Sequence, residues 1–276
     1  PTYNTSTMLE NYSKLLTAKY SPLFNRALQG TYAPGSTFKP CTAIAGLTEK
    51  TISTSTRIQC TGVYTKYAAQ GYTPQCWIYA SHLTHGFDNV TEALRDSCNI
   101  FFYTVGNNLG IDKLEKYARL FGLGESTGIE IGDNPGMLAG REEREAAGGI
   151  WYGGETTQAA IGQSDNLFTP LQLANYIATL VSGGKHCQAH LLKAVKTYDN
   201  AEVVALGNTQ PVNTVQFSDS TRQAIKEGML GYTQPGGMVY SYFKDCVVTA
   251  GAKTGTAQLG SNITNNGVFV CFAPYE

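Results

Sequence analysis

The chain has 276 residues, of which 42% are hydrophobic and 15% charged, and its formal net charge is −1. This near-neutral balance excludes the basic footprint that binding to nucleic acid or to an anionic membrane surface requires. No apolar run in the sequence approaches the roughly 18 residues of a membrane-spanning helix.

Hydrophobic periodicity, caps and glycine stops predict helices in five places along the chain. The first begins near Ser36 and continues to Leu47, and the others cover residues 91–107, 111–124, 169–184 and 218–232. Strands are predicted at 191–198, 244–257 and 267–273, whereas residues 52–86 show little periodicity and are expected to form a long loop or a small excursion. Helices followed by a late strand pair predict an α+β fold with a sheet in its core.

The first polar motif is Ser36-Thr-Phe-Lys39, which follows the glycine- and proline-rich stretch "GTYAPG". At positions i and i+3 of a helix the two side chains share one face, so the lysine amine can reach the serine oxygen. A lysine whose pKa is lowered by burial can take the serine proton and make the hydroxyl a nucleophile. Taken alone, the same spacing also fits a solvated helix end.

The second motif is Ser97-Cys98-Asn99, which interrupts an otherwise apolar helix. Polar side chains at such a break need partners or a cleft, because an unpaired buried polar group costs about 1–3 kcal/mol. Ser97 can relay a proton there and Asn99 can hold a substrate amide. A helix kink with satisfied polar groups is the alternative.

The third motif is Lys253-Thr254-Gly255-Thr256, inside the predicted strand at 244–257. A strand glycine lets another backbone approach closely. The threonine hydroxyls and strand N–H groups can bind a carboxylate, with the lysine supplying positive charge. A polar edge strand is the alternative for this motif.

In this order, Ser-x-x-Lys, Ser-x-Asn and Lys-Thr-Gly form the motif set of β-lactamases and penicillin-binding proteins. The sequence resembles that superfamily, and more closely the transpeptidase domain of class B penicillin-binding proteins. The resemblance covers nearly the whole chain through "SPLFNRALQGTYAPGSTFKP" (21–40), "HGFDNVTEALRDSCNIFFY" (85–103), "IGQSDNLFTPLQLANYIATLVSGG" (161–184) and "AKTGTAQ" (252–258).

This resemblance implies a role for each motif residue. The implied catalytic residues are Ser36 as acylated nucleophile, Lys39 as its base, Ser97 as proton relay and Asn99 as the group that binds the donor peptide amide. The implied substrate-binding residues are Lys253, Thr254, Gly255 and Thr256, which hold the terminal carboxylate. Backbone N–H groups of Ser36 and Thr256 form the implied oxyanion hole.

The implied fold is a mainly antiparallel sheet flanked by helices plus an all-helical subdomain, with the active site in the cleft between them. Residues 1–276 are expected to form a single transpeptidase domain, without the N-terminal anchor or pedestal region and without the last strand and helix of the family. The implied location is the extracytoplasmic face of a bacterial membrane, with a membrane glycosyltransferase as partner.

The implied reaction is peptidoglycan D,D-transpeptidation. A D-Ala-D-Ala stem peptide acylates the serine and releases D-alanine, and the amine of a neighbouring peptide then completes the cross-link without any cofactor. β-Lactam antibiotics mimic the donor and leave a slowly hydrolysed acyl-enzyme.

Three other activities share much of this motif set. A D,D-carboxypeptidase uses water in place of the acceptor amine. A serine β-lactamase needs a base for deacylation, and Glu130 has a suggestive Glu-x-x-x-Asn spacing, although "STGIEIGDNPG" looks more like the class B strand and turn. A β-lactam sensor domain acylates once and does not turn over.

A candidate zinc site lies in the polar stretch between the first two motifs. Cys60, Cys76, His82 and His85 offer two thiols and two imidazoles, a tetrahedral zinc set whose histidines at i and i+3 fit one helical turn. A disulfide between Cys60 and Cys76 and plain thiols are the alternatives. A zinc ion here would brace the wall next to Ser97 without taking part in acyl transfer. The remaining cysteines in apolar or small-residue settings, expected to be buried packing, are Cys41, Cys98, Cys246 and Cys271.

Overall fold

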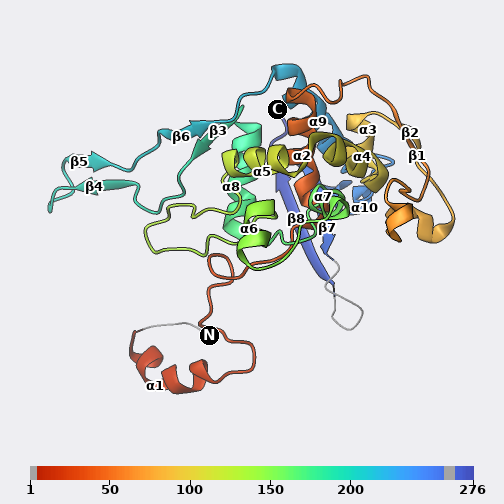
Figure 1. Ribbon diagram of the computed structural model, residues 1–276. Coiled ribbons are helices and arrows are strands. Elements are labelled where there is room, and N and C mark those ends of the chain that lie inside the picture. Colours follow the sequence, from red (N-terminus) through yellow and green to blue (C-terminus); the bar gives the residue numbers. More distant parts are fainter. Residues whose placement is uncertain (1–4, 258–264) are drawn as a thin grey trace.

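The computed structural model describes residues 5–257 and 265–276 (Figure 1). The helices are α1 (Thr5–Leu16), α2 (Lys39–Thr48), α3 (Val90–Arg95), α4 (Asn99–Leu109), α5 (Ile111–Leu120), α6 (Arg141–Ala146), α7 (Gly153–Ala159), α8 (Pro170–Val181), α9 (Asp219–Gly231) and α10 (Tyr240–Phe243), with 3₁₀ turns η1 (Gly35–Phe38), η2 (Ala68–Gln70) and η3 (Trp77–Ser81). The strands are β1 (Ile58–Cys60), β2 (Gly86–Asp88), β3 (Lys185–Cys187), β4 (Ala194–Lys196), β5 (Val203–Leu206), β6 (Pro211–Thr214), β7 (Gly251–Ala257) and β8 (Asn266–Phe272). They pair antiparallel as β1–β2, β3–β6, β4–β5 and β7–β8.

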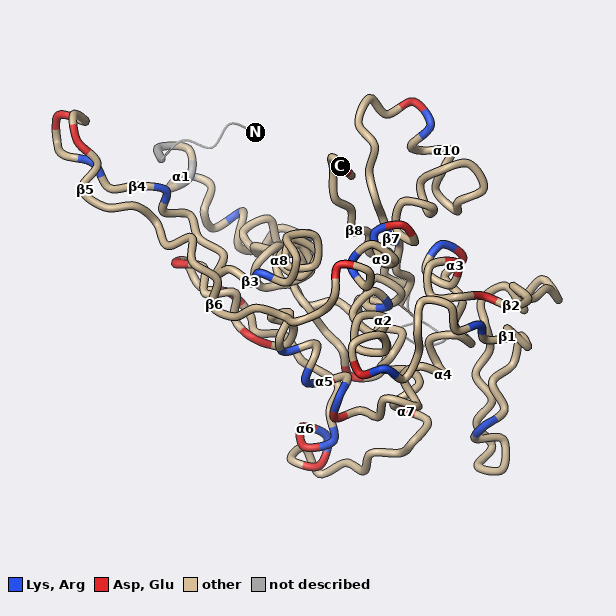
Figure 2. Tube along the Cα trace, turned by 90° about the horizontal axis from the view of Figure 1, so that it is seen from above, with Lys and Arg blue, Asp and Glu red and all other residues tan. Residues whose placement is uncertain are grey.

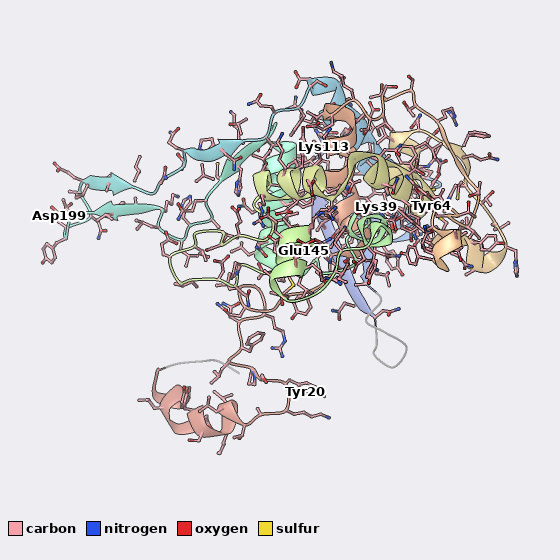
Figure 3. All side chains as sticks on the ribbon, viewed as in Figure 1. Tyr20, Lys39, Tyr64, Lys113, Glu145 and Asp199 are labelled. Atoms are coloured by element: carbon pink, nitrogen blue, oxygen red, sulfur yellow. The ribbon has the colours of Figure 1, made fainter. Side chains whose placement is uncertain are left out.

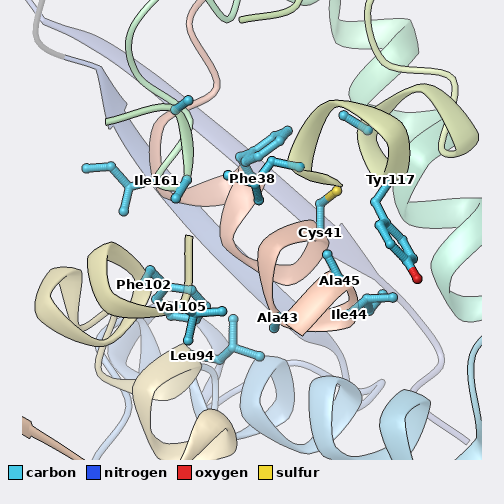
Figure 4. Packing of buried hydrophobic residues seen from close by; sticks show 14 of the residues in the cluster. Phe38, Cys41, Ala43, Ile44, Ala45, Leu94, Phe102, Val105, Tyr117 and Ile161 are labelled. Atoms are coloured by element: carbon cyan, nitrogen blue, oxygen red, sulfur yellow. The ribbon is translucent and has the colours of Figure 1, made fainter. Parts of the chain in front are cut away.

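Helix α2 runs through the centre of the hydrophobic core (Figure 4). Every residue from Lys39 to Gly46 is buried, and α4, α5 and α9 pack around the helix. Small side chains such as Ala43 and Ala45 permit this close packing, and both are fully buried. A helix that is enclosed on all sides is held by its neighbours, so the turn η1 that precedes α2 has a fixed position.

The β7–β8 pair lies against η1 and α9. Its register runs without a shift from Gly251 opposite Phe272 to Ala257 opposite Asn266. Successive side chains of a strand point to opposite faces, and Thr254 and Thr256 share the face that is less buried than the rest of β7. The Lys-Thr-Gly motif therefore presents its two hydroxyls on one side of the strand.

Two parts of the chain stand away from this body. The β3–β6 and β4–β5 pairs form an arm that projects to one side, and α1 lies apart from the other helices (Figure 1). Basic and acidic residues are interspersed along the trace (Figure 2), in agreement with the near-neutral net charge. No helix within the described ranges is long and apolar enough to cross a membrane.

The predicted helices are confirmed, and the predicted helix at 91–107 is divided into α3 and α4 at its polar break. The strand predicted at 244–257 is wrong in its first half, because α10 ends at Phe243 and β7 begins only at Gly251. Val247 and Val248 in that half are exposed side chains, so their β-branched character does not reflect a paired strand. The expected loop at 52–86 contains the short strand β1 and the first residue of β2.

Candidate active site

Ser36 lies in the turn η1, directly before α2, with its side chain partly exposed. Gly35 has a φ of +53°, and a Cβ on it would come within 2.9 Å of the Thr256 carbonyl oxygen. A Cβ on Gly255 would collide with the Pro34 carbonyl oxygen. The two glycines therefore let η1 and β7 approach closely, which brings the backbone of Ser36 near that of Thr256.

Lys39 is the first residue of α2 and is fully buried; Figure 3 marks its place inside the body of the molecule. Its Nζ donates to the Ser97 carbonyl oxygen at 2.8 Å, to Ser97 Oγ at 3.1 Å and to Asn99 Oδ1 at 2.7 Å. These three acceptors match the three donors of a protonated lysine. No hydrogen bond within the described residues joins Lys39 to Ser36, and such catalytic contacts often tighten only when substrate is bound.

Ser97 occupies the junction between α3 and α4 and has a φ of +54°. Residues with a Cβ rarely adopt this left-handed conformation, which costs about 1–3 kcal/mol and is concentrated at functional sites. Its buried Oγ accepts hydrogen bonds from both Lys39 and Lys253, the latter at 2.9 Å. The polar break in the sequence is thus a turn that holds one hydroxyl between two lysines.

Asn99 begins α4 and links this turn to the segment before η3. Its side-chain Nδ2 donates to the Gln75 carbonyl oxygen at 3.3 Å, and its backbone N–H donates to Cys76 Sγ at 3.3 Å. Its Oδ1 receives the hydrogen bond from Lys39. The amide is therefore fixed from both sides at the edge of the cleft.

Strand β7 contributes Lys253 and Thr254 from the third motif. Lys253 is fully buried, and its Nζ lies 4.1 Å from the ring centroid of Tyr232. The Tyr232 hydroxyl is hydrogen-bonded to Thr254 Oγ1. Sequence reasoning missed Tyr232, because it follows α9 far from any motif and nothing in its local sequence marks it.

These residues meet in one cleft of about 730 Å³. Its lining includes Ser36, Ser97, Asn99, Thr254 and Thr256, together with aromatic and amide side chains from the stretch 72–77 and from α7. No Asp or Glu is among the lining residues in the described part of the chain. With two lysines behind it, the cleft suits an anionic ligand.

Burial changes the proton affinity of both lysines. Burial lowers the pKa of Lys39 to about 8, against opposing contributions from Cys76 and Cys98. Burial and the adjacent positive charge of Lys39 lower the pKa of Lys253 well below its ordinary value. A lysine with a pKa near 8 can act as a base at neutral pH, as the sequence motif predicts for Lys39.

A compact group of thiol and imidazole side chains, of the types that can bind metals, lies next to Ser97 and Asn99. One ligand atom each from Cys60, Cys76, His85 and Cys98 lies within 4.8 Å of the others. His82, the fourth ligand expected from the sequence, lies outside this group, because it is an exposed residue with φ +58° where the turn η3 ends. Cys98 takes its place, although the sequence pattern indicated only buried packing for this thiol.

The four cysteines expected to be buried packing differ in their surroundings. Cys41 is buried in the core, as predicted, and Cys98 is also buried, within the group just described. For Cys246 and Cys271 the prediction is wrong, because both are exposed. Cys271 lies in β8, and small or apolar neighbours in sequence do not ensure burial on such a strand.

Glu130, the candidate deacylating base, is exposed and not among the residues that line the cleft. Its carboxylate accepts backbone N–H groups of Leu191 at 2.8 Å and of Leu192 at 3.1 Å. The Glu-x-x-x-Asn spacing thus belongs to a turn that anchors the base of the β-strand arm.

Comparisons with known proteins agree with this geometry. The family model of the penicillin binding protein transpeptidase domain matches residues 1–276. The peptidoglycan D,D-transpeptidase MrdA of Acinetobacter baumannii is 30% identical over 285 residues, which cover 97% of this chain and 41% of the relative. The chain therefore spans about two fifths of that relative's length.

Two solved structures have similar folds. Pseudomonas aeruginosa PBP2 in complex with WCK 5153 is 27% identical with a TM-score of 0.86, covering all of this chain and 62% of that one. A peptidoglycan synthase complex that coordinates polymerization and crosslinking contains a chain 33% identical with a TM-score of 0.75, covering 92% and 41%. The α+β fold predicted from the sequence is confirmed by these matches. The chain belongs to the penicillin-binding protein transpeptidase domain family.

Proposed function

We propose that this chain is a peptidoglycan D,D-transpeptidase domain that forms an acyl-enzyme at Ser36 and is inhibited by β-lactams. The observation that carries the proposal is the convergence of Ser36, Lys39, Ser97 and Lys253 on one cleft without a lining carboxylate. The activity named for the A. baumannii relative supports the reaction class. The family match over residues 1–276 supports a single transpeptidase domain.

The first step binds the donor stem peptide and acylates Ser36. The terminal carboxylate of D-Ala-D-Ala lies against Lys253, Thr254 and Thr256, and Asn99 binds the peptide amide. Ser36 Oγ attacks the carbonyl carbon between the two D-alanines and gives its proton to the neutral form of Lys39.

The tetrahedral intermediate then collapses. Its oxyanion accepts hydrogen bonds from the backbone N–H groups of Ser36 and Thr256, which the glycines of η1 and β7 allow to come close. Ser97, hydrogen-bonded to both lysines, relays a proton to the departing amine as the C–N bond breaks. D-Alanine leaves, and the donor peptide remains as an ester on Ser36.

In the second step the amine of a neighbouring stem peptide attacks this ester. A new amide bond forms as the ester bond to Ser36 Oγ breaks, and the proton lost by the amine passes through Lys39 to Ser36 Oγ. Side chains and backbone N–H groups supply every group in this scheme, so the proposed reaction requires no cofactor.

The decisive test is the intact mass of the protein after incubation with benzylpenicillin. We expect one covalent adduct per chain that persists for many minutes, because the described cleft offers no carboxylate to activate water. Absence of an adduct, or its loss within seconds, would contradict the proposal.

Carboxypeptidase and sensor activities are distinguished by a labelled stem peptide ending in D-Ala-D-Ala. A transpeptidase releases D-alanine and transfers the label to an added acceptor amine. A carboxypeptidase releases D-alanine without needing an acceptor, and a sensor domain releases none.

A β-lactamase role for Glu130 is tested directly by Glu130→Gln. We expect the lifetime of the benzylpenicillin adduct to remain within about twofold of the wild type, because the carboxylate is bonded to Leu191 and Leu192 outside the cleft. Time-resolved mass spectrometry measures the lifetime. A lifetime at least ten times longer in the variant would instead identify Glu130 as the deacylating base.

The cellular setting is part of the proposal. Stem peptides are cross-linked outside the cytoplasmic membrane, so we place the domain on the extracytoplasmic face, anchored by a segment outside these residues. The synthase complex that combines polymerization with crosslinking supports a membrane glycosyltransferase as partner.

We further propose a structural zinc site formed by Cys60, Cys76, His85 and Cys98. Three thiols and one imidazole within 4.8 Å of one another match the donor set of closed zinc sites. Hydrogen bonding with Cys98 lowers the pKa of Cys76 and of Cys60, and the same contacts raise the pKa of Cys98. Cys76 and Cys60 are therefore the thiols that most readily become the thiolates that bind metal. His85 Nε2 is buried and has no hydrogen-bond partner within the described residues.

The position of Cys98 defines what such an ion does. Cys98 lies between Ser97 and Asn99, and Cys76 accepts the backbone N–H of Asn99. A zinc ion would thus brace the turn that carries the second motif, while its ligands remain outside the reacting groups. A disulfide between Cys60 and Cys76 is the competing arrangement; the structure has both thiols free.

The two histidines provide a matched pair of variants. We expect protein purified without added zinc to contain about one equivalent, His82→Ala to retain it and His85→Ala to lose it, with a lower melting temperature, because a ligand is removed. Metal analysis and thermal unfolding measure both effects. The zinc proposal would be wrong if the wild type contained less than a tenth of an equivalent of zinc. Two fewer titratable thiols before reduction would then show that Cys60 and Cys76 form the disulfide instead.

A further inference from the structure

Tyr232 contacts two of the residues proposed to bind the substrate carboxylate. It is fully buried where α9 ends and contributes to the lining of the cleft. Lys253 Nζ lies over its ring, 4.1 Å from the ring centroid, and its hydroxyl is hydrogen-bonded to Thr254 Oγ1. One side chain therefore touches both members of the proposed anion site.

The Tyr232 ring stabilises the ammonium of Lys253, which has few other stabilising neighbours. Lys253 Nζ donates to Ser97 Oγ and to the Thr254 carbonyl oxygen, and no carboxylate in the described part of the chain bonds to it. The ammonium of Lys39, which also contacts Ser97, opposes a second positive charge at Lys253. The negative face of an aromatic ring attracts an ammonium ion, most strongly where water is excluded.

The hydroxyl acts on the orientation of Thr254. A threonine hydroxyl rotates freely unless a partner fixes it, and it can accept one hydrogen bond while donating its own hydrogen elsewhere. When the Tyr232 phenol donates to Thr254 Oγ1, the threonine hydrogen is directed away from the phenol. Because Thr254 lines the cleft, that hydrogen is available to a ligand carboxylate.

We propose that Tyr232 is a positioning residue of the carboxylate subsite: its ring holds the ammonium of Lys253 and its hydroxyl orients Thr254. The inference rests on the proposed acyl transfer and adds to it a residue that acts through two others. Tyr232 takes no part in bond making at Ser36, so its loss reduces binding of the anion and leaves the acylation step itself nearly unchanged.

Two substitutions separate the two contributions. Tyr232→Phe keeps the ring and removes the hydroxyl, and we expect the acylation efficiency toward benzylpenicillin to fall about fivefold to tenfold. Tyr232→Leu removes the ring as well, and the expected loss is about 30-fold. Both losses are expected in the inhibitor binding constant rather than in the maximal acylation rate.

The methyl ester of benzylpenicillin provides the internal control, because it lacks the carboxylate. With the ester, each Tyr232 variant should lose no more than about twofold, whereas Thr254→Val should show the same selective loss for the free acid as Tyr232→Phe. Tyr176→Phe alters another fully buried tyrosine, in α8. It should leave the acylation efficiency unchanged with both the acid and the ester. The ratio of acid to ester is measured within one sample, so partial unfolding of a variant does not distort it.

Equal losses for acid and ester, or an unchanged Tyr232→Phe, would overturn the positioning role while leaving the proposed function intact. A wild-type chain that forms no adduct at Ser36 would overturn the proposed function and this inference with it.

Discussion

Ser36→Ala is expected to abolish the covalent benzylpenicillin adduct while leaving the fold intact. Ser36 is a partly exposed residue in η1, directly before the buried helix α2, and its position depends on the backbone of η1 rather than on its own side chain. Removing one oxygen there creates no cavity in the core and leaves no buried partner unpaired, so the stability cost should be within about 1 kcal/mol. Without this oxygen no ester can form.

Intact mass spectrometry checks the adduct, and thermal unfolding checks the fold. Ser55→Ala is a matched control, because it removes an exposed serine hydroxyl that does not line the cleft. The control should acylate at the wild-type rate. An adduct that forms at the same rate in Ser36→Ala would place the nucleophile elsewhere, and peptide mapping of that adduct would identify it.

The helices of the core were predictable because their signals are local. In α8, Thr169 accepts the N–H of Gln172 and Gln172 in turn accepts the N–H of Thr169, and the helix is capped as the sequence indicates. The β3–β6 and β4–β5 arm was largely missed, since its short strands pair with each other by register and carry few buried residues. Pairing between distant segments has no signature within either segment alone.

In the candidate site, too, local spacing was visible in the sequence and contacts between distant segments were not. The spacing of Ser36 and Lys39 predicts that they act together, but the hydrogen bonds of Lys39 go to Ser97 and Asn99, some 60 positions away along the chain. The turn η1 is a 3₁₀ turn and Lys39 begins the α-helix, so the face-sharing rule for a regular helix describes the pair incompletely. Only the packing of α4 against α2 reveals what the lysine contacts.

The proposed zinc site illustrates why spacing alone misleads. His82 and His85 have the i, i+3 separation of a helical turn, yet His82 adopts a left-handed conformation and the chain then turns into β2. Cys98 enters the group from the start of α4, which lies outside the polar stretch searched for ligands. A candidate ligand contributed by another element can be recognised only after the fold is known.

Lys39→Ala is expected to slow acylation by roughly three to four orders of magnitude, because nucleophile and base act as one unit. The wild-type rate should also depend on pH in a defined direction. Burial lowers the pKa of Lys39 to about 8, and the three hydrogen bonds that it donates describe the protonated form. A base must be neutral, so the rate should fall about tenfold for each pH unit below 8 and level off above it.

The methyl ester of benzylpenicillin isolates this effect, because its binding does not depend on the charge of Lys253. Lys39→Arg is the matched variant: a guanidinium stays protonated throughout this range, so acylation should be slow and its rate should not change between pH 6 and 9. Stopped-flow measurement with the ester gives the profile for both proteins. A wild-type rate that is constant across this range would mean that another group accepts the Ser36 proton, and a pH-dependent rise retained in Lys39→Arg would lead to the same conclusion. If both expectations hold, the lowered pKa of one buried lysine sets the pH at which this cleft becomes reactive.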